Sequence, residues 1–189
     1  MEEFLIDKYG ENKGKELWRL TSDKVTKLMN KTKLATSKDR KDTLKNVIFS
    51  KPALYFVLHE KGLSKEEAYD VVYEFLHTVV CVKSKKQYQT MEKIPCFFTI
   101  FKKVFIKKTT TSDLWTSSLK CSGKDSFEVD ITRCLWHDAC SEAGCPEICK
   151  LFCGNDDENF GELRKIKFIR KGTLGRGDKM CDFMFEKRK

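Results

Sequence analysis

The 189-residue sequence contains no apolar run close to the roughly 18 residues that a membrane-spanning helix needs. Its first residues, MEEFLIDKYGENKGK, are acidic and mixed, so they lack the basic and apolar segments of a secretory signal peptide. We therefore expect a cytoplasmic protein with no membrane partner. Because thiols stay reduced in the cytoplasm, we expect the nine cysteines to be thiols rather than disulfides, and their odd number leaves at least one unpaired in any case.

Familiar cysteine patterns for metals are also missing. The sequence has neither the Cys-x-x-Cys pair of a zinc ribbon nor the Cys-x-x-Cys-x-x-Cys run of a ferredoxin. Cys145, Cys149 and Cys153 are spaced by four and would share one face of a helix, a spacing that permits a metal cluster. We expect no cofactor, and bound zinc stays open as an alternative.

The motifs that mark nucleic-acid-binding proteins, such as arginine-rich helices and aromatic RNA-binding segments, do not occur either. The net charge of +9 comes largely from lysines that are spread along the whole chain, often in pairs. This distribution is typical of solvated helix faces. We therefore expect no nucleic-acid partner, although a basic surface would attract an anionic small substrate.

A helical period dominates residues 11–108. Ser64 precedes Glu67 by three residues, and this spacing is a capping-box signal for the start of a helix. Pro52 interrupts the pattern between residues 40 and 60, so the sequence allows either one kinked helix or two helices there. The expected helices lie at about 13–30, 40–50, 52–60, 65–82 and 96–108, and a strand is an alternative for part of the last.

The period changes to two after a polar, turn-rich segment at residues 109–125. Strands are expected near 127–134, 166–173 and 181–185, with short helices at 135–144 and 146–152 that end at Gly144 and Gly154. The predicted fold is α+β, with an N-terminal helical layer packed on a small C-terminal antiparallel sheet that carries two short inserted helices. We divide the chain into residues 1–110 and 111–189, which together form one compact domain.

Three cysteines and an acid in the C-terminal part are the candidate catalytic residues. A thiolate is the strongest nucleophile among the side chains. Cys134 ends a predicted strand and Cys153 ends a predicted helix, where side chains often face a cleft, whereas Cys181 has the apolar parity of the last strand. Asp156, three residues after Cys153, is a candidate to carry or orient a proton.

Three further residues are candidates for substrate binding. His137 follows Cys134 by three residues, and a Cys–His pair is a recurrent way to activate a thiol, although a solvated histidine is an equally simple interpretation. Arg170, on a predicted strand, is suited to hold a carboxylate with two hydrogen bonds, or else to form a surface ion pair. Asp182 follows Cys181 and is a second acid near the same predicted hairpin.

These residues occur in a recognisable order. The order is a strand ending at Cys134, then Gly144-Cys145-Pro146-Glu147, Cys153-x-x-Asp156, Phe168-x-Arg170-x-x-Thr173-Leu174-x-x-Gly177-Asp178 and Cys181-Asp182-Phe183. It resembles the L-2-amino-thiazoline-4-carboxylic acid hydrolase family over about residues 127–185, and the helical half resembles the family only in layout. The resemblance implies a cytoplasmic bacterial hydrolase acting on C–N bonds of cyclic amidines, which opens 2-amino-thiazoline-4-carboxylate to N-carbamoyl-L-cysteine or breaks a related C–N or C–S bond.

The hypothesis that follows makes Cys134 or Cys153 the nucleophile, with a slight preference for Cys134 because it ends a strand. Asp156 would hold or protonate the amidine nitrogens with Asp182 as its substitute, and Arg170 would bind the carboxylate of the small-molecule substrate. Alternatively, the three cysteines and Asp156 would bind a zinc ion that activates water.

The rival interpretation is a non-catalytic module that binds a small ligand or a metal. The helical half could also form the contact surface of a homodimer. Whether the three thiols and Asp156 meet at one pocket separates an enzyme from this rival.

Overall fold

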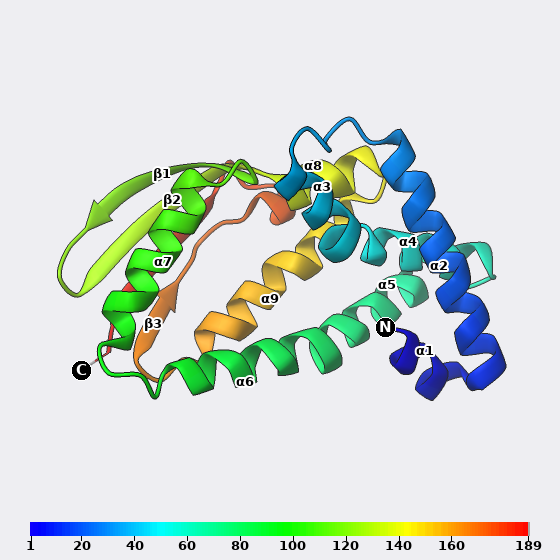
Figure 1. The fold of residues 1–189 in the computed structure, drawn as a ribbon, viewed down its shortest axis with the longest axis horizontal. Coiled ribbons are helices and arrows are strands. Elements are labelled where there is room, and N and C mark those ends of the chain that lie inside the picture. Colours follow the sequence, from blue (N-terminus) through cyan, green and yellow to red (C-terminus); the bar gives the residue numbers. More distant parts are fainter. Residues whose placement is uncertain (189) are drawn as a thin grey trace. The chain divides into compact units, whose positions relative to one another are not determined.

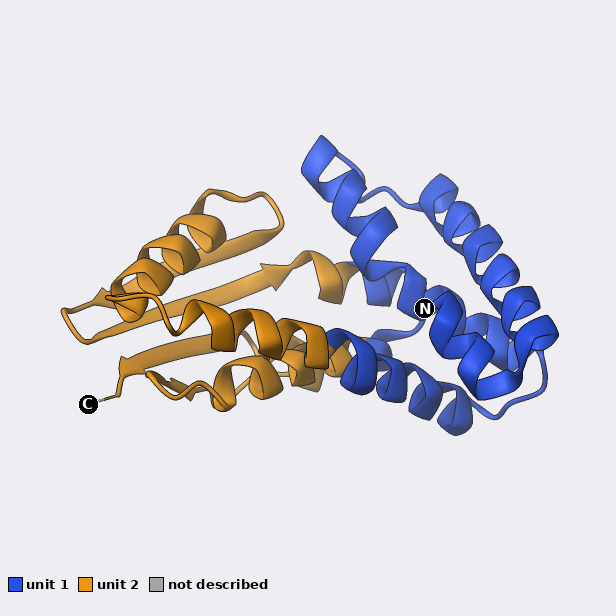
Figure 2. Ribbon diagram, turned by 60° about the horizontal axis from the view of Figure 1, so that its bottom comes forward, with its two compact units in different colours: residues 1–80, 139–148 blue, residues 81–138, 149–189 orange. Residues whose placement is uncertain are grey.

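The computed structural model describes residues 1–188. The chain forms two compact units, residues 1–80 with 139–148 and residues 81–138 with 149–189 (Figure 2). The division into residues 1–110 and 111–189 stays a prediction about domains, since a compact unit need not fold alone. The two units are described separately.

Unit 1 is helical. Its elements are α1 (Glu2–Tyr9), α2 (Glu11–Lys31), α3 (Lys38–Thr43), the π-helical turn η1 (Leu44–Ile48), α4 (Ser50–Glu60), α5 (Lys65–Phe75), most of the π-helical η2 (Leu76–Cys81), the end of α8 (Leu135–Glu142) and the 3₁₀ turn η3 (Pro146–Ile148). The capping box of α5 is confirmed, because the Glu67 amide donates to Ser64 Oγ at 3.1 Å and the Ser64 amide donates to Glu67 Oε2 at 2.7 Å.

The sheet belongs to unit 2 and has four antiparallel strands in the order β1-β2-β4-β3 (Figure 1). The strands are β1 (Trp115–Ser122), β2 (Ser126–Cys134), β3 (Ile166–Ile169) and β4 (Cys181–Lys187). The helices of this unit are α6 (Val82–Met91), α7 (Phe97–Thr111), the start of α8, α9 (Cys149–Gly161) and the 3₁₀ turn η4 (Leu174–Arg176). The predicted α+β class with an antiparallel sheet is therefore confirmed.

Aromatic rings fill the space between α7, α9 and the sheet. Phe127 of β2 lies opposite Phe185 of β4 in the strand register, and the two rings stack 5.0 Å apart. Phe101 of α7 and Phe160 of α9 contact Phe185 from the helices, with centroids 5.1 and 5.3 Å away. Such edge-to-face contacts stabilise a core beyond the burial of area alone. They hold α7 and α9 against one face of the sheet.

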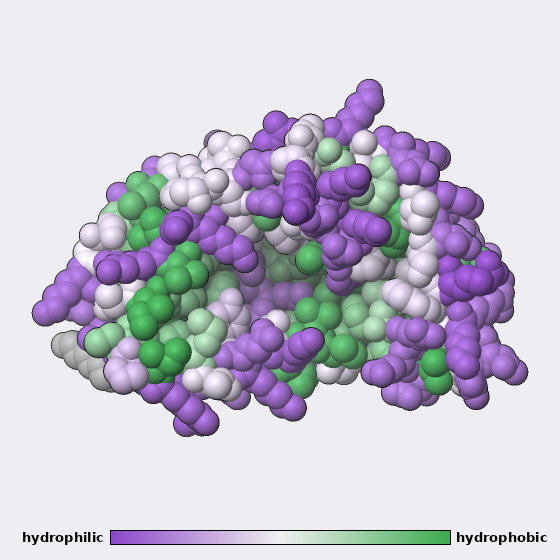
Figure 3. All heavy atoms as spheres, in the orientation of Figure 1, coloured by the Kyte–Doolittle hydropathy of each residue, from purple (hydrophilic) through white to green (hydrophobic). Residues whose placement is uncertain are grey.

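The outer side of α7 is apolar as well. Ile100 and Val104 are 40% and 56% exposed, and apolar atoms gather along this helix in Figure 3. Hydrophobic residues on both sides of α7 explain why the sequence of residues 96–108 was also compatible with a strand. The structure shows a helix over Phe97–Thr111.

Two local expectations are wrong. Residues 109–125 were expected to be turn-rich, but β1 occupies 115–122 as an edge strand whose polar side chains are mostly exposed while its backbone pairs with β2. Gly154 was expected to end a helix, yet α9 continues to Gly161. Burial of Phe160 in the aromatic core favours this extension and outweighs the weak helix propensity of glycine. Two helices, α1 and α6, also lie where the sequence predicted no separate element.

Among residues 1–188, no helix is both long enough and apolar enough to cross a membrane.

Two glycine substitutions test the packing of the helices. A Cβ atom at Gly14 would lie 2.5 Å from the Cα atom of Ile6, because α1 and α2 approach closely there, whereas a Cβ atom at Gly154 would meet no atom within 4 Å. We expect Gly14→Ala to lower the free energy of unfolding by about 1–3 kcal/mol through overpacking. Gly154→Ala is expected to raise it by roughly 0.5–1 kcal/mol through helix propensity. Urea denaturation measures both, and a shift of the same sign in the two variants would contradict the described packing.

Candidate active site

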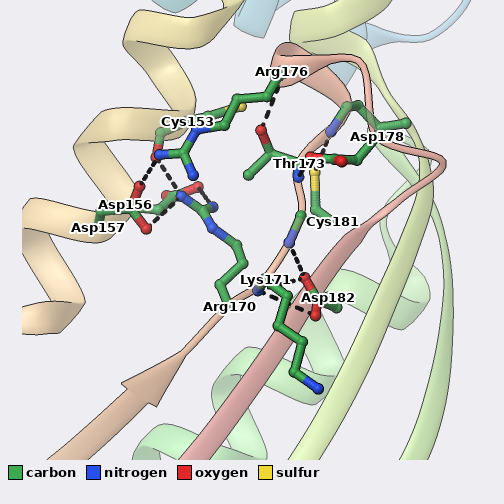
Figure 4. A network of polar contacts seen from close by, with 12 residues as sticks. Cys153, Asp156, Asp157, Arg170, Lys171, Thr173, Arg176, Asp178, Cys181 and Asp182 are labelled. Atoms are coloured by element: carbon green, nitrogen blue, oxygen red, sulfur yellow. Dashed lines mark hydrogen bonds and ion pairs between the residues drawn. The ribbon is translucent and has the colours of Figure 1, made fainter.

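Cys153 lies in the middle of α9, and its sulfur is surrounded by hydrogen-bond donors. The thiols of Cys149 and Cys181, the hydroxyl of Thr173 and the amide of Gly175 lie near it and are able to donate to it. Cys149 is one helical turn earlier on α9, and Cys181 begins β4. Figure 4 shows Cys153 on the helix facing the turn that carries Thr173 and the first residue of the neighbouring strand. The site is therefore built from α9, β4 and the intervening turn.

Thr173 is fully buried, and its hydroxyl group lies near this sulfur. Its oxygen accepts a hydrogen bond from the Arg176 amide at 3.2 Å, which caps the short helix η4. A hydroxyl has one proton to donate. Since the oxygen accepts from Arg176, the proton is available for the sulfur of Cys153.

Gly175 allows the backbone to approach the same sulfur. A Cβ atom at this position would lie 2.8 Å from Cys153 Sγ and 3.1 Å from the backbone of Cys149. Any side chain would push the turn away from α9. The absence of a side chain at residue 175 therefore brings an amide donor to the thiol.

The donors change the acidity of the thiol. The hydrogen bond from Cys149, followed by those from Cys181, Thr173 and Gly175, lowers the pKa of Cys153 far below that of an ordinary thiol, although burial opposes the shift. The hydrogen bond to Cys153, together with burial, raises the pKa of Cys181 well above its ordinary value. The Leu174 amide, which donates to Cys181 Sγ at 3.3 Å, opposes that rise. The cluster thus holds its negative charge on Cys153.

Cys134 belongs to the same neighbourhood but is the weaker acid. Burial raises its pKa to about 12, and the charges of Cys153 and Asp156 add to that effect. The amides of His137 and Trp136 donate to its sulfur and oppose the rise. Cys134 and Cys153 therefore each interact with Asp156 and with Cys181.

Asp156 lies one turn after Cys153 and lines a pocket of about 210 Å³. The pocket is walled mainly by apolar and aromatic side chains, and its residues are Tyr88, Phe105, Lys108, Thr109, Trp115, Ile131, Asp156, Phe160 and Phe183. The carboxyl group lines this pocket and retains 37% exposure. Burial raises the pKa of Asp156 to about 7, Arg170 opposes the rise, and the Cys153 charge adds to it. A group with this pKa gives and takes protons near neutral pH.

Arg170 is held inside the protein. Its side chain is 2% exposed. The guanidinium contacts Asp156 Oδ2 at 3.1 Å, Asp157 Oδ1 at 2.7 Å and the Cys153 carbonyl oxygen at 2.6 Å, as Figure 4 shows. It also lies 5.3 and 5.1 Å from the ring centres of Phe168 and Phe183. These contacts fit a residue that positions α9 better than one that receives a substrate carboxylate.

The other two predicted binding residues have structural contacts. Asp182 accepts hydrogen bonds from the amides of Lys171 at 3.0 Å and Gly172 at 2.7 Å, so its carboxylate shapes the turn after β3. The imidazole of His137 lies 3.8 Å from Asp138, and only its backbone amide reaches Cys134. A Cys–His pair of side chains is not the arrangement that the structure shows here.

Several residues of the site escaped the sequence reasoning. Thr173 was expected to end a strand and Gly175 to lie in the turn after it, and the spacing of Cys149 and Cys153 by four was considered only as one that permits a metal cluster. Trp115 reaches the pocket from an edge strand that the polar sequence concealed. Within residues 1–188, no group of three or more histidine, cysteine, aspartate or glutamate side chains is arranged to hold a metal ion.

Comparison with known families gives one decisive match. The model of the L-2-amino-thiazoline-4-carboxylic acid hydrolase family matches residues 41–185. The chain belongs to this family. The match includes every candidate residue of the site and extends into the helices upstream of residue 127, where the sequence resemblance was only general. Membership of a family named for a hydrolase makes an enzyme the leading interpretation of the site.

A search of curated proteins gives no significant match. Among solved structures, the chain is similar to the Fe(II) unliganded H-NOX protein from K. algicida, with 12% identity, a TM-score of 0.32 and coverage of 100% of this chain and 95% of that chain. A point mutant of the same protein matches with 11% identity, a TM-score of 0.30 and coverage of 99% and 94%. Scores this low carry no argument about fold or function.

Alkylation kinetics test the charge on Cys153. We expect iodoacetamide, which is smaller than an aminothiazoline carboxylate, to label Cys153 at a rate that changes little between pH 5 and pH 8, because a thiol with a strongly lowered pKa is already ionised. Cys134, with its pKa raised to about 12, should label slowly and faster as the pH rises. Peptide mass spectrometry assigns the labelled sites, with Cys153→Ser as the control. A Cys153 rate that increases tenfold per pH unit, or no labelling of Cys153 at any pH, would contradict a reactive thiolate.

Proposed function

We propose that the protein hydrolyses a cyclic amidine, 2-amino-thiazoline-4-carboxylate or a close relative, to the corresponding N-carbamoyl thiol, with Cys153 as nucleophile and Asp156 as proton carrier. One observation carries the proposal: the most acidic thiol of the cluster lies one helical turn from a carboxyl group with a pKa of about 7 that lines a small pocket. A nucleophile and an adjacent group that exchanges protons are the two parts that such a reaction needs.

In the first half of the reaction, the Cys153 thiolate attacks C2 of the ring while protonated Asp156 gives its proton to the ring nitrogen. The tetrahedral centre then collapses with cleavage of the bond between C2 and the ring sulfur, whose electron pair stays on the sulfur. Cys153 is left bound through its sulfur to an amidinium carbon, and the substrate carries a free thiolate.

In the second half, water adds to this amidinium carbon and the Asp156 carboxylate takes one of its protons. The new tetrahedral centre expels the Cys153 thiolate, and the remaining proton moves to the substrate thiolate. The product is a urea with a free thiol, and both side chains return to their starting protonation states. The overall change is the addition of one water molecule.

Cys153 is preferred over Cys134 as the nucleophile because of their surroundings. Four potential hydrogen-bond donors around Cys153 favour its thiolate, whereas burial raises the pKa of Cys134 to about 12. A protonated thiol is a poor nucleophile. In this proposal Cys134 lines the neighbourhood of the site and Cys181 serves as a hydrogen-bond donor.

Paired substitutions separate the two thiols. We expect Cys153→Ser to lower kcat by about 10³-fold or more, since a serine hydroxyl lacks the ionised sulfur. Cys134→Ser should keep kcat within about tenfold of the wild-type value, because it alters only a neighbouring side chain. Release of the substrate thiol, followed with a disulfide reagent, measures both rates. The reverse ranking would transfer the nucleophile to Cys134, and full activity of both variants would exclude a thiol nucleophile.

The pH profile tests Asp156. Because the pKa of Asp156 is about 7, the protonated form that acts as an acid is lost as the pH rises through 7. We therefore expect kcat/KM to fall above pH 7, which gives the pH profile a descending alkaline limb. Asp156→Asn should lower kcat/KM by roughly 10²- to 10⁴-fold and abolish this limb. Asp157→Asn removes a neighbouring carboxylate and should retain the limb. An unchanged limb in Asp156→Asn would assign the titration to another group.

A further inference from the structure

An acidic and a basic side chain line the pocket between α7 and α9, and we infer that they bind the two ends of the substrate. Asp156 of α9 holds the amidine, and Lys108 of α7 holds the carboxylate. Lys108 is thus assigned as the residue that selects carboxylated rings. This inference rests on the proposed function for the identity of the reaction, but the pocket itself defines the ligand class.

The size of the pocket limits the ligand. Its volume of about 210 Å³ is below the roughly 300–1,000 Å³ of sites that take drug-sized molecules. A single five-membered ring with two small substituents has a suitable size. Larger ring systems would have to extend out of the pocket.

The walls favour a planar ring that carries positive charge. Phe105, Trp115 and Phe183 reach the pocket from α7, β1 and β4, and Tyr88 reaches it from α6. Trp115 is held flat against Trp136, with ring centres 5.4 Å apart and planes 8° from parallel. Aromatic faces attract delocalised cations. An amidinium ring that lies against these faces therefore gains contact area and electrostatic attraction together.

Lys108 is the cation that is available to a carboxylate. It is exposed and lines the pocket, and over residues 1–188 its ammonium group makes no ion pair. Arg170 is unsuitable for this role because its guanidinium is 2% exposed and already contacts Asp156 and Asp157. Thr109 cannot substitute for Lys108, since its hydroxyl donates to backbone carbonyl oxygens of α7.

The two ends of the pocket match a ligand with an amidine at one end, which shares one proton with Asp156, and an anionic carboxylate at the other, which pairs with Lys108. A ligand with two anionic ends would meet Asp156, and one with two cationic ends would meet Lys108, so both are disfavoured. A ring that lacks the carboxylate keeps the aromatic and Asp156 contacts and loses only the contact with Lys108. That difference makes the inference measurable.

Binding is measured by calorimetry in a Cys153→Ser background, which prevents turnover, and kinetics are measured in the wild-type background. The two probes are 2-amino-2-thiazoline-4-carboxylate and 2-amino-2-thiazoline, which lacks the carboxylate. The variants are Lys108→Met, Lys108→Arg as the conservative replacement, and Lys107→Met as a control. Lys107→Met removes one positive charge from the preceding residue of α7. Lys107 does not line the pocket.

We expect Lys108→Met to weaken binding of the carboxylated probe about ten- to hundredfold, the range for a hydrogen bond between charged groups. Its affinity for 2-amino-2-thiazoline should stay within about twofold, as should the affinity of Lys107→Met for both probes. Lys108→Arg should restore most of the loss. In kinetics, the loss should appear as a higher KM for the carboxylated probe alone.

Equal weakening of both probes, no weakening in Lys108→Met, or no binding of the carboxylated probe to the parent protein overturns the assignment. The expected affinities without turnover by the wild-type protein support the pocket assignment and refute the proposed hydrolysis. Turnover that depends on Cys153 but not on Lys108 supports the proposed hydrolysis and refutes the assignment of Lys108.

Discussion

The buried guanidinium of Arg170 joins the helix that carries the reactive groups to the sheet that supports them. It leaves the end of β3, lies over the rings of Phe168 and Phe183, and binds the Cys153 carbonyl oxygen and the carboxylates of Asp156 and Asp157 on α9. Removing one partner from such a buried pair leaves an uncompensated charge, which is strongly destabilising. The positions of the thiol and the acid relative to the η4 turn therefore depend on this one side chain.

Two potentially anionic groups on adjacent turns of one helix share the available charge. The donors around Cys153 favour its thiolate, and that thiolate in turn helps to raise the pKa of Asp156. The protein thus prepares a nucleophile and an acid together, rather than two charges that repel each other. The apolar wall of the pocket reinforces the same division, because it removes water from the carboxyl group while the sulfur is compensated by fixed donors. Burial outweighs the amides of His137 and Trp136 that donate to Cys134, so this thiol remains protonated.

Much of the fold could be predicted from the sequence because periodicity is local. The capping box at Ser64 and the alternation of Phe127, Val129 and Ile131 each report on their own neighbours. The edge strand β1 could not be predicted, since its polar residues are held by pairing with β2 rather than by burial. The same limit applies to the site: Cys153, Asp156 and Cys181 stood out by residue type, whereas the roles of Thr173 and Gly175 depend on a turn folding back onto α9. Arg170 stood out as a cation, but its burial among aspartates is a tertiary property.

The central claim is that the substrate becomes bonded to Cys153. Acid quenching of wild-type protein within one turnover of 2-amino-thiazoline-4-carboxylate, followed by peptide mass spectrometry, tests it directly. Attack on C2 with ring opening loses no atoms, so the account predicts that the peptide containing Cys153 gains the mass of one intact substrate molecule, and that the adduct decays as the N-carbamoyl product appears. Product formation at full rate with no adduct on any cysteine at any quench time would contradict it.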